Sequence, residues 1–301
     1  MFLNRYPIYI PSRGRYQKSR ALTVQFLMKD KVPFRVVVEE DEYEQYVRIV
    51  GKKRVLVLPF RNKGLYKARC WIMEHSISEG HERHWQLDDN ILRVLRKLKE
   101  RCINCASGVA FRVVEDFTDR YENIAISGLN YEMFVTDATN KPFVKNAHVY
   151  SCTLVNNKIP HRWRLMYNDD TDFCLQVLSD GWCTILVNAF MVKKVRTMLI
   201  RGGNTDDLYQ GDGRLNMARS LERVWPYVVS VARRFGRPQH VVRNAWKNFD
   251  TPLKLKPGID LSKMKTNDYG MQLVMLRTPA TKEVREFAER NNAVLQDEVD
   301  P

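Results

Sequence analysis

In the first hundred residues, short runs of apolar residues alternate with segments in which apolar residues recur at helical spacing. Strands are expected at 6–10, 34–38 and 54–58, where short runs are rich in valine and isoleucine. Helices are expected at 20–30, 43–50 and 65–78, where apolar residues recur with helical spacing. Strands that alternate with helices in this way indicate βαβ units and a largely parallel sheet.

A fourth strand is expected around Trp85, and it ends in two carboxylates and an amide. These are the side chains of Asp88, Asp89 and Asn90. In open α/β sheets, ligands bind beyond the carboxyl ends of the strands. Hard oxygen ligands there suit an Mg²⁺ or Mn²⁺ ion that also contacts a substrate phosphate. The alternative is that the three residues only cap a helix over residues 91–95.

More polar residues are expected at the same edge of the sheet. A nucleoside diphosphate laid across that edge would meet arginines for its phosphates and carboxylates for its ribose or base. The chain contains neither the dinucleotide-binding fingerprint nor the P-loop motif. The alternatives are a solvated basic turn for the first arginines and an exposed helix position for Arg69. The residues are Ser12, Arg13 and Arg15 after the first strand, Glu39 after the second, and Gly64 and Arg69 after the third.

A second acidic cluster, Asn168 to Asp172, opens a helix expected at 173–179. Acidic residues at a helix N-terminus are favoured by the helix dipole, so simple capping is one interpretation. The functional interpretation is a general base that takes a proton from an acceptor hydroxyl, with Asp172 binding or orienting that acceptor. Before this cluster, a helix is expected at 109–121 and strands at 124–126 and 149–155, the first strand ending at Gly128.

The chain is strongly basic. It has 301 residues, 49 lysines and arginines against 35 aspartates and glutamates, and a formal net charge of +14. An excess of this size suggests a polyanionic partner, nucleic acid first and an anionic membrane surface second. The alternative is a basic surface without such a partner. No apolar run approaches the ~18 residues of a membrane span, so no membrane association is expected.

The cysteines and the N-terminus favour a cytoplasmic protein. No signal peptide is recognised, so the six cysteines are expected to be reduced thiols. Cys102 and Cys105 form the tightest pair. A zinc site completed by His81 and His84 is the alternative to small hydrophobic residues without a metal.

Cations mixed with aromatic residues follow in the second half, a composition that suits a nucleic-acid strand or a flipped base. Exposed backbone amides at glycines would add contacts to phosphates. The alternative is that Trp246 and Phe249 belong to the core and that the cations are only solvated. The candidate DNA-binding residues are Lys193, Lys194, Arg196, Arg201, Gly202, Gly203, Arg243 and Trp246.

The order of these motifs resembles that of a glycosyltransferase of the GT-A fold. Within that fold, the chain is most similar to the TET-associated glycosyltransferases of bacteriophages, from about residue 6 to about residue 250. The order and spacing carry the resemblance more than any single motif. The motifs are Ile10 to Arg15, Gly64 with Ala68 and Arg69, Leu87 to Asn90, and Asn168 to Asp172.

The resemblance implies an α/β fold with a mostly parallel central sheet flanked by helices. It implies a GT-A-like domain over 1–250, with a nucleotide-sugar half at 1–125 and an acceptor half at 126–250. A C-terminal extension over 251–301 has no assigned role. The implied reaction moves a sugar, expected to be glucose, from a UDP-sugar onto 5-hydroxymethylcytosine in DNA, with Mn²⁺ or Mg²⁺. Such a phage-encoded enzyme would act in the host cytoplasm, and no stable protein partner is expected.

The resemblance also implies roles for individual residues. Pro11 to Arg15 and Glu39 would face the uridine, Arg69 the phosphates, and Asp88 the ribose. Asp89 or Asn90 would hold the metal, although Asn90 stands where the family pattern has Asp, so the ligand among Asp88, Asp89 and Asn90 stays open. Asp170 would be the base in an inverting reaction, or would support the oxocarbenium charge in a retaining one.

Two other functions fit parts of the sequence. A GT-A transferase that acts on polysaccharide, lipid or protein accounts for the acidic clusters but not for the basic excess. A non-catalytic nucleic-acid-binding protein accounts for the charge but leaves the carboxylates at the strand ends unused.

Overall fold

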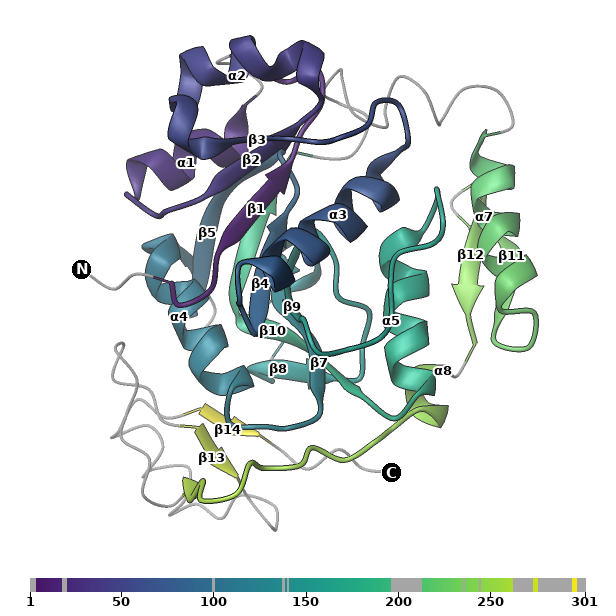
Figure 1. Ribbon diagram of the computed structural model, residues 1–301. Helices are drawn as coiled ribbons and strands as arrows, with labels where there is room; N and C mark the ends of the chain where they lie inside the picture. The colour runs from purple at the N-terminus through teal and green to yellow at the C-terminus, as the bar shows by residue number, and fades with distance from the viewer. Residues whose placement is uncertain are drawn as a thin grey trace.

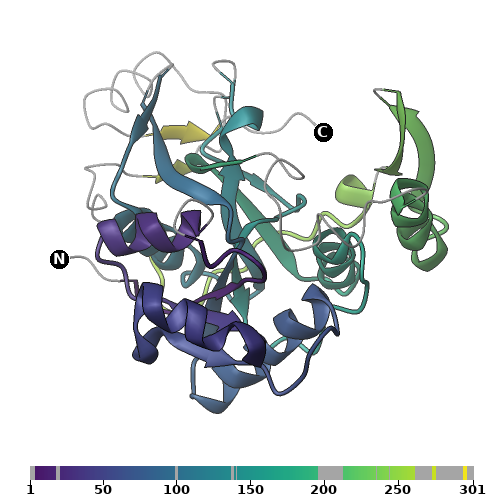
Figure 2. The same cartoon turned by 90° about the horizontal axis from the view of Figure 1, so that it is seen from above.

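The fold is built around one large sheet with helices on both faces (Figures 1 and 2). The structure, a computed structural model, describes residues 4–17, 21–98, 101–136, 139, 141–195, 213–234, 236–243, 245–261, 273–275 and 294–296. Within these ranges the sheet has ten strands in the order β3-β2-β1-β4-β9-β7-β10-β5-β6, with β8 paired to β10. Their bounds are β1 Ile8–Pro11, β2 Arg35–Val38, β3 Val55–Val57, β4 Arg83–Leu87, β5 Ile91–Leu98, β6 Arg101–Asn104, β7 Ile124–Tyr131, β8 Phe143–Lys145, β9 Cys152–Asn156 and β10 Cys183–Lys194.

Most strands of this sheet run in the same direction. β1 is parallel to β2 and β4, and β2 is parallel to β3. β9 is antiparallel to both β4 and β7, so β7 again runs with the first four strands, and β10 is parallel to β7. β5 and β8 are antiparallel to β10. The prediction of a mostly parallel α/β sheet is therefore confirmed.

Helices cover the two faces because successive strand residues point to opposite sides. In β1, Ile8 and Ile10 belong to the core with α1, α2 and α4, whereas Tyr9 packs with α3. Helix α5 packs on the same face as α3 (Figure 1). The helix bounds are α1 Leu22–Lys29, α2 Tyr43–Val50, α3 Leu65–Ser78, α4 Ser107–Thr118, α5 Asp169–Ser179, α7 Gly213–Val224 and α8 Ala245–Asn248.

Short elements complete the described chain. The antiparallel hairpin of β11 (Val229–Arg234) and β12 (Arg237–Val242) packs with α7 beside α5, where Leu221 and Val229 meet Leu175 (Figure 2). The 3₁₀ helices are η1 Glu40–Glu42, η2 Lys52–Arg54 and η3 Glu132–Phe134, and β13 (Leu273–Met275) pairs with β14 (Val294–Gln296). Residues just after 250 pack on the main sheet, because Asn123 Nδ2 donates to the Pro252 carbonyl at 2.8 Å.

The structure corrects one alternative and one local prediction. The alternative of a helix over residues 91–95 is wrong, since these residues belong to β5, which pairs with β10 on one side and β6 on the other. β7 does not end at Gly128 but continues to Tyr131. A Cβ atom at Gly128 would lie 2.4 Å from the Cys152 carbonyl oxygen, so this glycine permits the close approach of β9 and does not terminate the strand.

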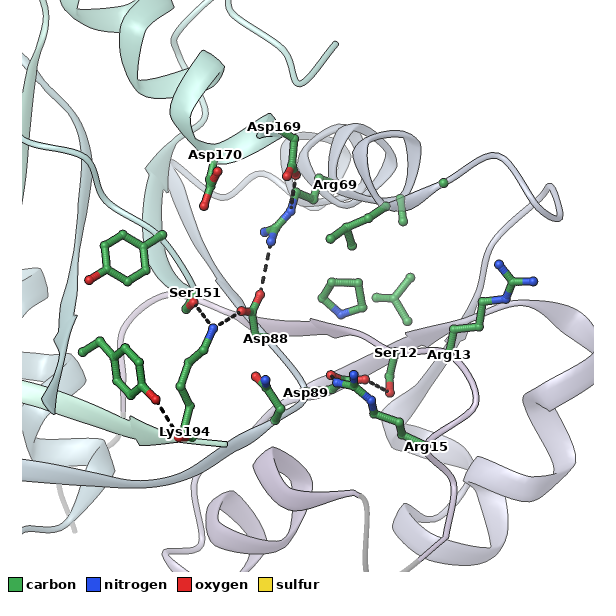
Figure 3. Close-up of a pocket in the computed structure, with 18 of the residues that line it drawn as sticks. Ser12, Arg13, Arg15, Arg69, Asp88, Asp89, Ser151, Asp169, Asp170 and Lys194 are labelled. Atoms are coloured by element: carbon green, nitrogen blue, oxygen red, sulfur yellow. Dashed lines mark hydrogen bonds and ion pairs between the residues drawn. The ribbon is translucent and has the colours of Figure 1, made fainter. Parts of the chain in front are cut away.

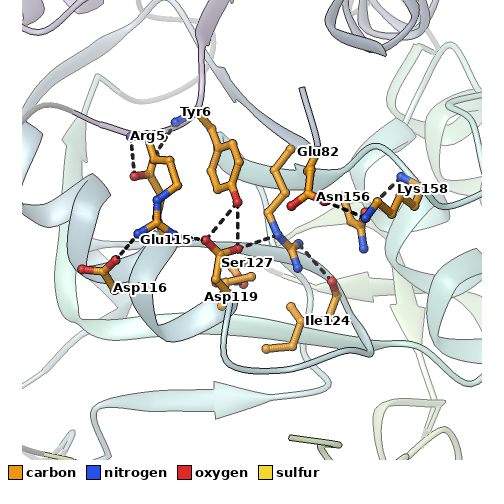
Figure 4. Close-up of polar contacts among 12 residues, drawn as sticks. Arg5, Tyr6, Glu82, Glu115, Asp116, Asp119, Ile124, Ser127, Asn156 and Lys158 are labelled. Carbon is orange, nitrogen blue, oxygen red and sulfur yellow. Dashed lines mark hydrogen bonds and ion pairs between the residues drawn. The ribbon is translucent and has the colours of Figure 1, made fainter. Parts of the chain in front are cut away.

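A polar network ties the N-terminus to α4 (Figure 4). Buried Glu115 accepts hydrogen bonds from the backbone N–H of Arg5 at 2.7 Å and from the Trp85 indole at 2.9 Å. Asp119 accepts from the Tyr6 hydroxyl at 2.9 Å and from Arg83 Nε at 3.1 Å. These bonds hold β1 and β4 against α4, and so fix the strands whose ends carry the predicted motifs.

His84 lies in β4 with both ring nitrogens bonded inside the core. Gln86 Nε2 donates to His84 Nε2 at 2.8 Å, so the proton is on Nδ1, which donates to Asn157 Oδ1 at 2.6 Å. The ring has no exposed surface. Burial lowers the pKa of His84 to about 4, because the charged imidazolium would lose its hydration.

His84 should make the protein sensitive to mild acid. Between the ordinary histidine pKa of ~6.5 and the folded value of about 4, the unfolded chain binds more protons than the folded one. The free energy of unfolding should therefore fall as the pH falls through this window, by about 3 kcal/mol from this residue. Urea denaturation at several pH values would measure the slope. A His84→Gln variant should show a smaller slope, and equal slopes in both proteins would contradict the assignment.

Candidate active site

The strand ends meet in one cavity of about 550 Å³ (Figure 3). It lies beyond the carboxyl ends of β1, β2 and β4 and is closed by the N-terminal ends of α3 and α5 and by the end of β10. The sequence-predicted residues that line it are Pro11, Ser12, Arg13, Arg15, Glu39, Gly64, Arg69, Asp88, Asp89, Asn90, Asp170 and Lys194. The structure thus brings the two acidic clusters together, although they are far apart in the chain.

Arg69 joins the two acidic clusters (Figure 3). Its side chain is 7% exposed, and its Nη2 lies 3.3 Å from Asp88 Oδ1 while its Nε lies 3.0 Å from Asp169 Oδ2. Gln86 Oε1 accepts a further bond from Nη1 at 3.3 Å. Gly64, just before α3, has φ +84°, a conformation that other residues rarely adopt. It allows the chain to turn into the helix that places Arg69 over β4.

Asp88 lies between two cations. Besides Arg69, the Lys194 ammonium lies 3.1 Å from Asp88 Oδ2, and the same ammonium donates to Ser151 Oγ at 2.6 Å. The backbone N–H of Asp88 donates to the Ser151 carbonyl at 2.7 Å, which fixes the end of β4. Burial alone would raise the pKa of Asp88, but Lys194 and Arg69 hold it below its ordinary value. Asp88 is therefore an ionised carboxylate.

Asp89 holds the loop after β1. It accepts a hydrogen bond from Ser12 Oγ at 2.6 Å and forms an ion pair with the Arg15 guanidinium. Its side chain is nearly buried, and this burial raises the pKa of Asp89 despite the neighbouring arginine. At the outer end of the same loop, Arg13 Nη2 donates to Asn62 Oδ1 at 2.7 Å.

In the second acidic cluster, the Asp169 carboxylate pairs with Arg69, whereas the Asp170 carboxylate contacts a histidine. Asp170 Oδ2 lies 3.3 Å from His148 Nε2, and Asp170 Oδ1 accepts from the Thr171 backbone N–H at 2.7 Å. Burial opposes ionisation, but His148 and Arg69 hold the pKa of Asp170 below its ordinary value. Burial, together with Asp170 and Asp88, raises the pKa of Asp169 to about 6. Asp170 is therefore an ionised carboxylate at the cavity wall.

Comparison with known proteins identifies the family. The family model described as TET-Associated Glycosyltransferase matches residues 6–203, about two thirds of the chain. The chain belongs to this family. It is therefore a glycosyltransferase.

No curated protein matches this glycosyltransferase. A solved crystal structure of a mannose-1-phosphate geranyltransferase from Thermus thermophilus is 12% identical, with a TM-score of 0.30. The match covers 92% of this chain and 85% of the other. A TM-score this low supports no conclusion about the glycosyltransferase. In the described part of the chain, no helix has the length and apolar character needed to cross a lipid bilayer.

Several lining residues of the glycosyltransferase were not predicted. Sequence patterns at strand ends did not reveal the polar and aromatic ones because they come from the loop before β9, from η3 and from the end of the long strand β7. The alternation of His148 and Tyr150 just before β9 was the one available signal. The polar and aromatic ones are Tyr131, Phe134, His148, Tyr150 and Ser151, and Val37, Leu58 and Leu65 add apolar lining. Ala68 and Asp169 also line the cavity; they belong to motifs recognised in the sequence, which assigned them no role of their own.

Asp172 does not line the cavity, unlike the other predicted catalytic residue, Asp170. Its side chain has 0% exposure. It lies on the face of α5 opposite Asp170, since residues two positions apart in an α-helix are rotated by about 200° around the helix axis. It accepts from Arg164 Nη2 at 2.9 Å, from the Trp225 indole at 2.8 Å and from Gln176 Nε2 at 2.8 Å. The helical period was a signal that separated these two aspartates in the sequence.

The predicted metal ligands are already paired with other groups. Both Asp88 oxygens contact cations, and both Asp89 oxygens contact Arg15 or Ser12. Asn90 Nδ2 donates to the Val195 carbonyl at 3.1 Å, and Asn90 Oδ1 is buried without a hydrogen-bond partner among the described residues. This uncharged oxygen is a weak ligand. Among the described residues, no group of three or more His, Cys, Asp or Glu could hold a metal ion. The residues present do not fit the predicted Mn²⁺ or Mg²⁺ site.

The candidate DNA-binding residues lie in different places. Lys194 belongs to the cavity, and Lys193 instead forms an ion pair with Glu132 at 3.2 Å. Arg243 is exposed, whereas Trp246 packs against the core and stacks on the His148 ring with an interplanar angle of 6°. Arg196, Arg201, Gly202 and Gly203 lie outside the described residues.

Asp172 should therefore be needed for stability and not for substrate binding. An Asp172→Asn variant should lower the free energy of unfolding by about 2 kcal/mol. The reason is that Arg164, Trp225 and Gln176 would lose the buried carboxylate to which they donate. The loss is smaller than for a fully buried pair because Arg164 is half-exposed. Chemical denaturation would measure it, and UDP affinity should not change. A large loss of UDP affinity with normal stability would instead place Asp172 in the site.

Proposed function

We propose that this glycosyltransferase moves a sugar from a UDP-sugar to the hydroxymethyl group of 5-hydroxymethylcytosine in DNA. The observation that carries the proposal is the cavity in which Arg69 and Lys194 lie between the residues at the ends of β1 and β2 and the Asp170 carboxylate (Figure 3). Its volume of about 550 Å³ lies within the range of small-molecule sites. Family membership supports the transfer of a sugar, and the net charge of +14 supports a polyanionic acceptor.

The donor would lie across the ends of β1, β2 and β4. The lining there combines Pro11 with Arg13 and Glu39, a mixture of an apolar ring, a donor and an acceptor that suits a uracil and a ribose. The diphosphate would then lie near Arg69 and Lys194, whose charges complement phosphate oxygens. This orientation directs the sugar toward Asp170.

The acceptor hydroxyl would approach from the Asp170 side. Its oxygen attacks the anomeric carbon, the bond from that carbon to the diphosphate breaks, and UDP leaves. In an inverting reaction the hydroxyl proton passes to the Asp170 carboxylate, which is ionised because of His148 and Arg69. In a retaining reaction the same carboxylate supports the positive charge that develops on the sugar, and the hydroxyl proton passes to the departing diphosphate oxygen.

An aromatic edge beside Asp170 is suited to the acceptor base. Phe134 lines the cavity but is 57% exposed, an unusual exposure for a phenylalanine. Its ring contacts Tyr131 and Tyr150 edge-to-face, with centroids 5.7 and 6.3 Å away. A cytosine lifted out of the duplex could stack on such a ring, and a base must leave the stack before its substituent reaches an enclosed site.

Transfer of label from UDP-sugars to DNA tests the function. We expect labelled UDP-glucose to modify a duplex with 5-hydroxymethylcytosine and not the same duplex with cytosine. Asp170→Asn should lower the transfer rate by about 100-fold or more while UDP still binds, since general bases contribute at least this factor. Labelling of a polysaccharide, lipid or protein without labelling of DNA would contradict the proposed acceptor, and tight DNA binding without any transfer would contradict catalysis.

Phe134 should affect the acceptor and not the donor. Phe134→Ala should raise the KM for hydroxymethylated DNA by about tenfold, because one stacked base contributes ~1–3 kcal/mol. The Kd for UDP should stay the same. Tyr227→Ala is the control, since Tyr227 is 97% exposed and is not part of the cavity lining. An unchanged KM in Phe134→Ala, or an equal rise in the control, would contradict the stacking role.

A further inference from the structure

The position beside Asp88 is occupied by a side-chain cation of the chain itself. The Lys194 ammonium lies 3.1 Å from Asp88 Oδ2 and 2.6 Å from Ser151 Oγ (Figure 3). It lies 5.9 Å from the centre of the Tyr131 ring, over its face. These three groups come from the end of β4, from the loop before β9, and from β7. Lys194 is therefore held from several sides and is not a free surface lysine.

Burial and register fix this ammonium at the cavity. The Lys194 side chain is only 10% exposed, and it lines the same cavity as Arg69. The pairing of β10 with β5 shifts between Lys193 and Lys194, so Lys194 pairs with Ile91 and Leu92 is left out of register. Lys193 pairs with Glu132, while Lys194 turns to Asp88.

The acidic motif has little capacity left for a divalent ion. Asp89 accepts a hydrogen bond from Ser12 and forms an ion pair with Arg15, and each oxygen of Asp88 contacts a cation. The remaining candidate ligand, Asn90, carries no charge. Mg²⁺ is usually held by one or two carboxylates together with substrate phosphates, and a carboxylate already shared by an ammonium and a guanidinium attracts it less.

We propose that Lys194, together with Arg69, supplies the positive charge for the donor diphosphate, so that the glycosyltransferase acts without a divalent cation. This inference rests on the proposed function of the same cavity. The anomeric C–O bond breaks with its electron pair on the diphosphate oxygen, which gains negative charge. The ammonium and the guanidinium stabilise that charge in the departing UDP. The acceptor hydroxyl supplies the oxygen that replaces the diphosphate on the anomeric carbon, and the step needs no other reactant.

The carboxylates around the two cations act as positioning groups. Asp88 contacts both cations, and Asp169 holds the Nε side of Arg69 at 3.0 Å. The guanidinium and the ammonium are thus fixed before the donor arrives, and such preorganised charge stabilises a transition state more than mobile charge does. Asp88 would have this role in place of direct metal ligation.

Binding of UDP in the presence and absence of metal tests the inference. The full chain, stripped with EDTA, should bind UDP by titration calorimetry with a Kd within about twofold of that in ~5-fold excess Mn²⁺ over UDP, a margin well below the tenfold that ~1.4 kcal/mol represents. Transfer to hydroxymethylated DNA should also proceed in EDTA. If UDP binding and transfer both require Mn²⁺, the inference is wrong while the proposed function stands. If UDP binds under neither condition, both are wrong.

Variants at Lys194 give an independent measurement. Lys194→Met keeps the aliphatic length but removes the charge, and should raise the Kd for UDP in EDTA by at least about tenfold, the effect of one charged hydrogen bond. Lys158→Met is the matched control, because Lys158 also pairs with a carboxylate, Glu82 at 2.7 Å, but lies outside the cavity lining. An unchanged Kd in Lys194→Met would overturn the inference.

A charge reversal distinguishes the electrostatic role from a structural one. Lys194→Asp would place a further carboxylate beside Asp88 and remove the competing ammonium. Its UDP binding should be lost in EDTA and recover in Mn²⁺, which a merely structural lysine would not produce. Circular dichroism would verify folding. If the variant unfolds, the EDTA measurements on the unaltered chain still decide the question, and a folded variant that binds UDP equally in EDTA would contradict the inference.

Discussion

The buried guanidinium of Arg69 is the interaction on which the site depends. It contacts Asp88 at the end of β4 and Asp169 at the start of α5, and so links the two acidic clusters across the cavity. A buried guanidinium is tolerable only when carboxylates and hydrogen-bond acceptors compensate its lost hydration. The carboxylates in turn need the cation. Removal of either partner would leave an uncompensated charge in the wall of the cavity, so these ion pairs tie α3, β4 and α5 together there.

Strand β10 provides the other constraint. Its twelve residues pair in parallel with β7 and antiparallel with β5, and they end at Lys194. The first strands supply the loops at which the donor nucleotide is expected to bind, whereas β10 closes the cavity from the second half of the chain. The cavity therefore contains a strand-end site of the kind common to α/β sheets, with the addition of a cation from a distant strand. This arrangement places positive charge between the expected donor and acceptor sides.

Much of the first half could be predicted because its signals are local. Helix α3 was predicted at 65–78, as observed. The Val-rich run of β2 was recognised because buried parallel strands are continuously apolar. The apolar run of β3 was recognised too, although β3 lies at the edge of the sheet and its Val57 is exposed. The residues after β1, β2 and β4 were predicted to meet because parallel strands end at one edge. The sequence left residues 91–95 open to a helix because a short apolar run fits either a strand or a helix. The pairing of this run with β10, almost a hundred residues later, decided for the strand.

The sequence by itself determined the order of the elements, the family, and the residues at the strand ends, since these follow from periodicity and from motifs of neighbouring residues. The tertiary structure alone decided which cation neutralises each carboxylate. It showed that Lys194 contacts Asp88. The helical period places Asp170 and Asp172 on different faces of α5, but only the structure showed that the cavity lies on the Asp170 side and that Trp225 meets Asp172. The physical reason is that ion pairs form between side chains distant in sequence, and their partners are fixed by sheet register and helix packing, which no local pattern encodes.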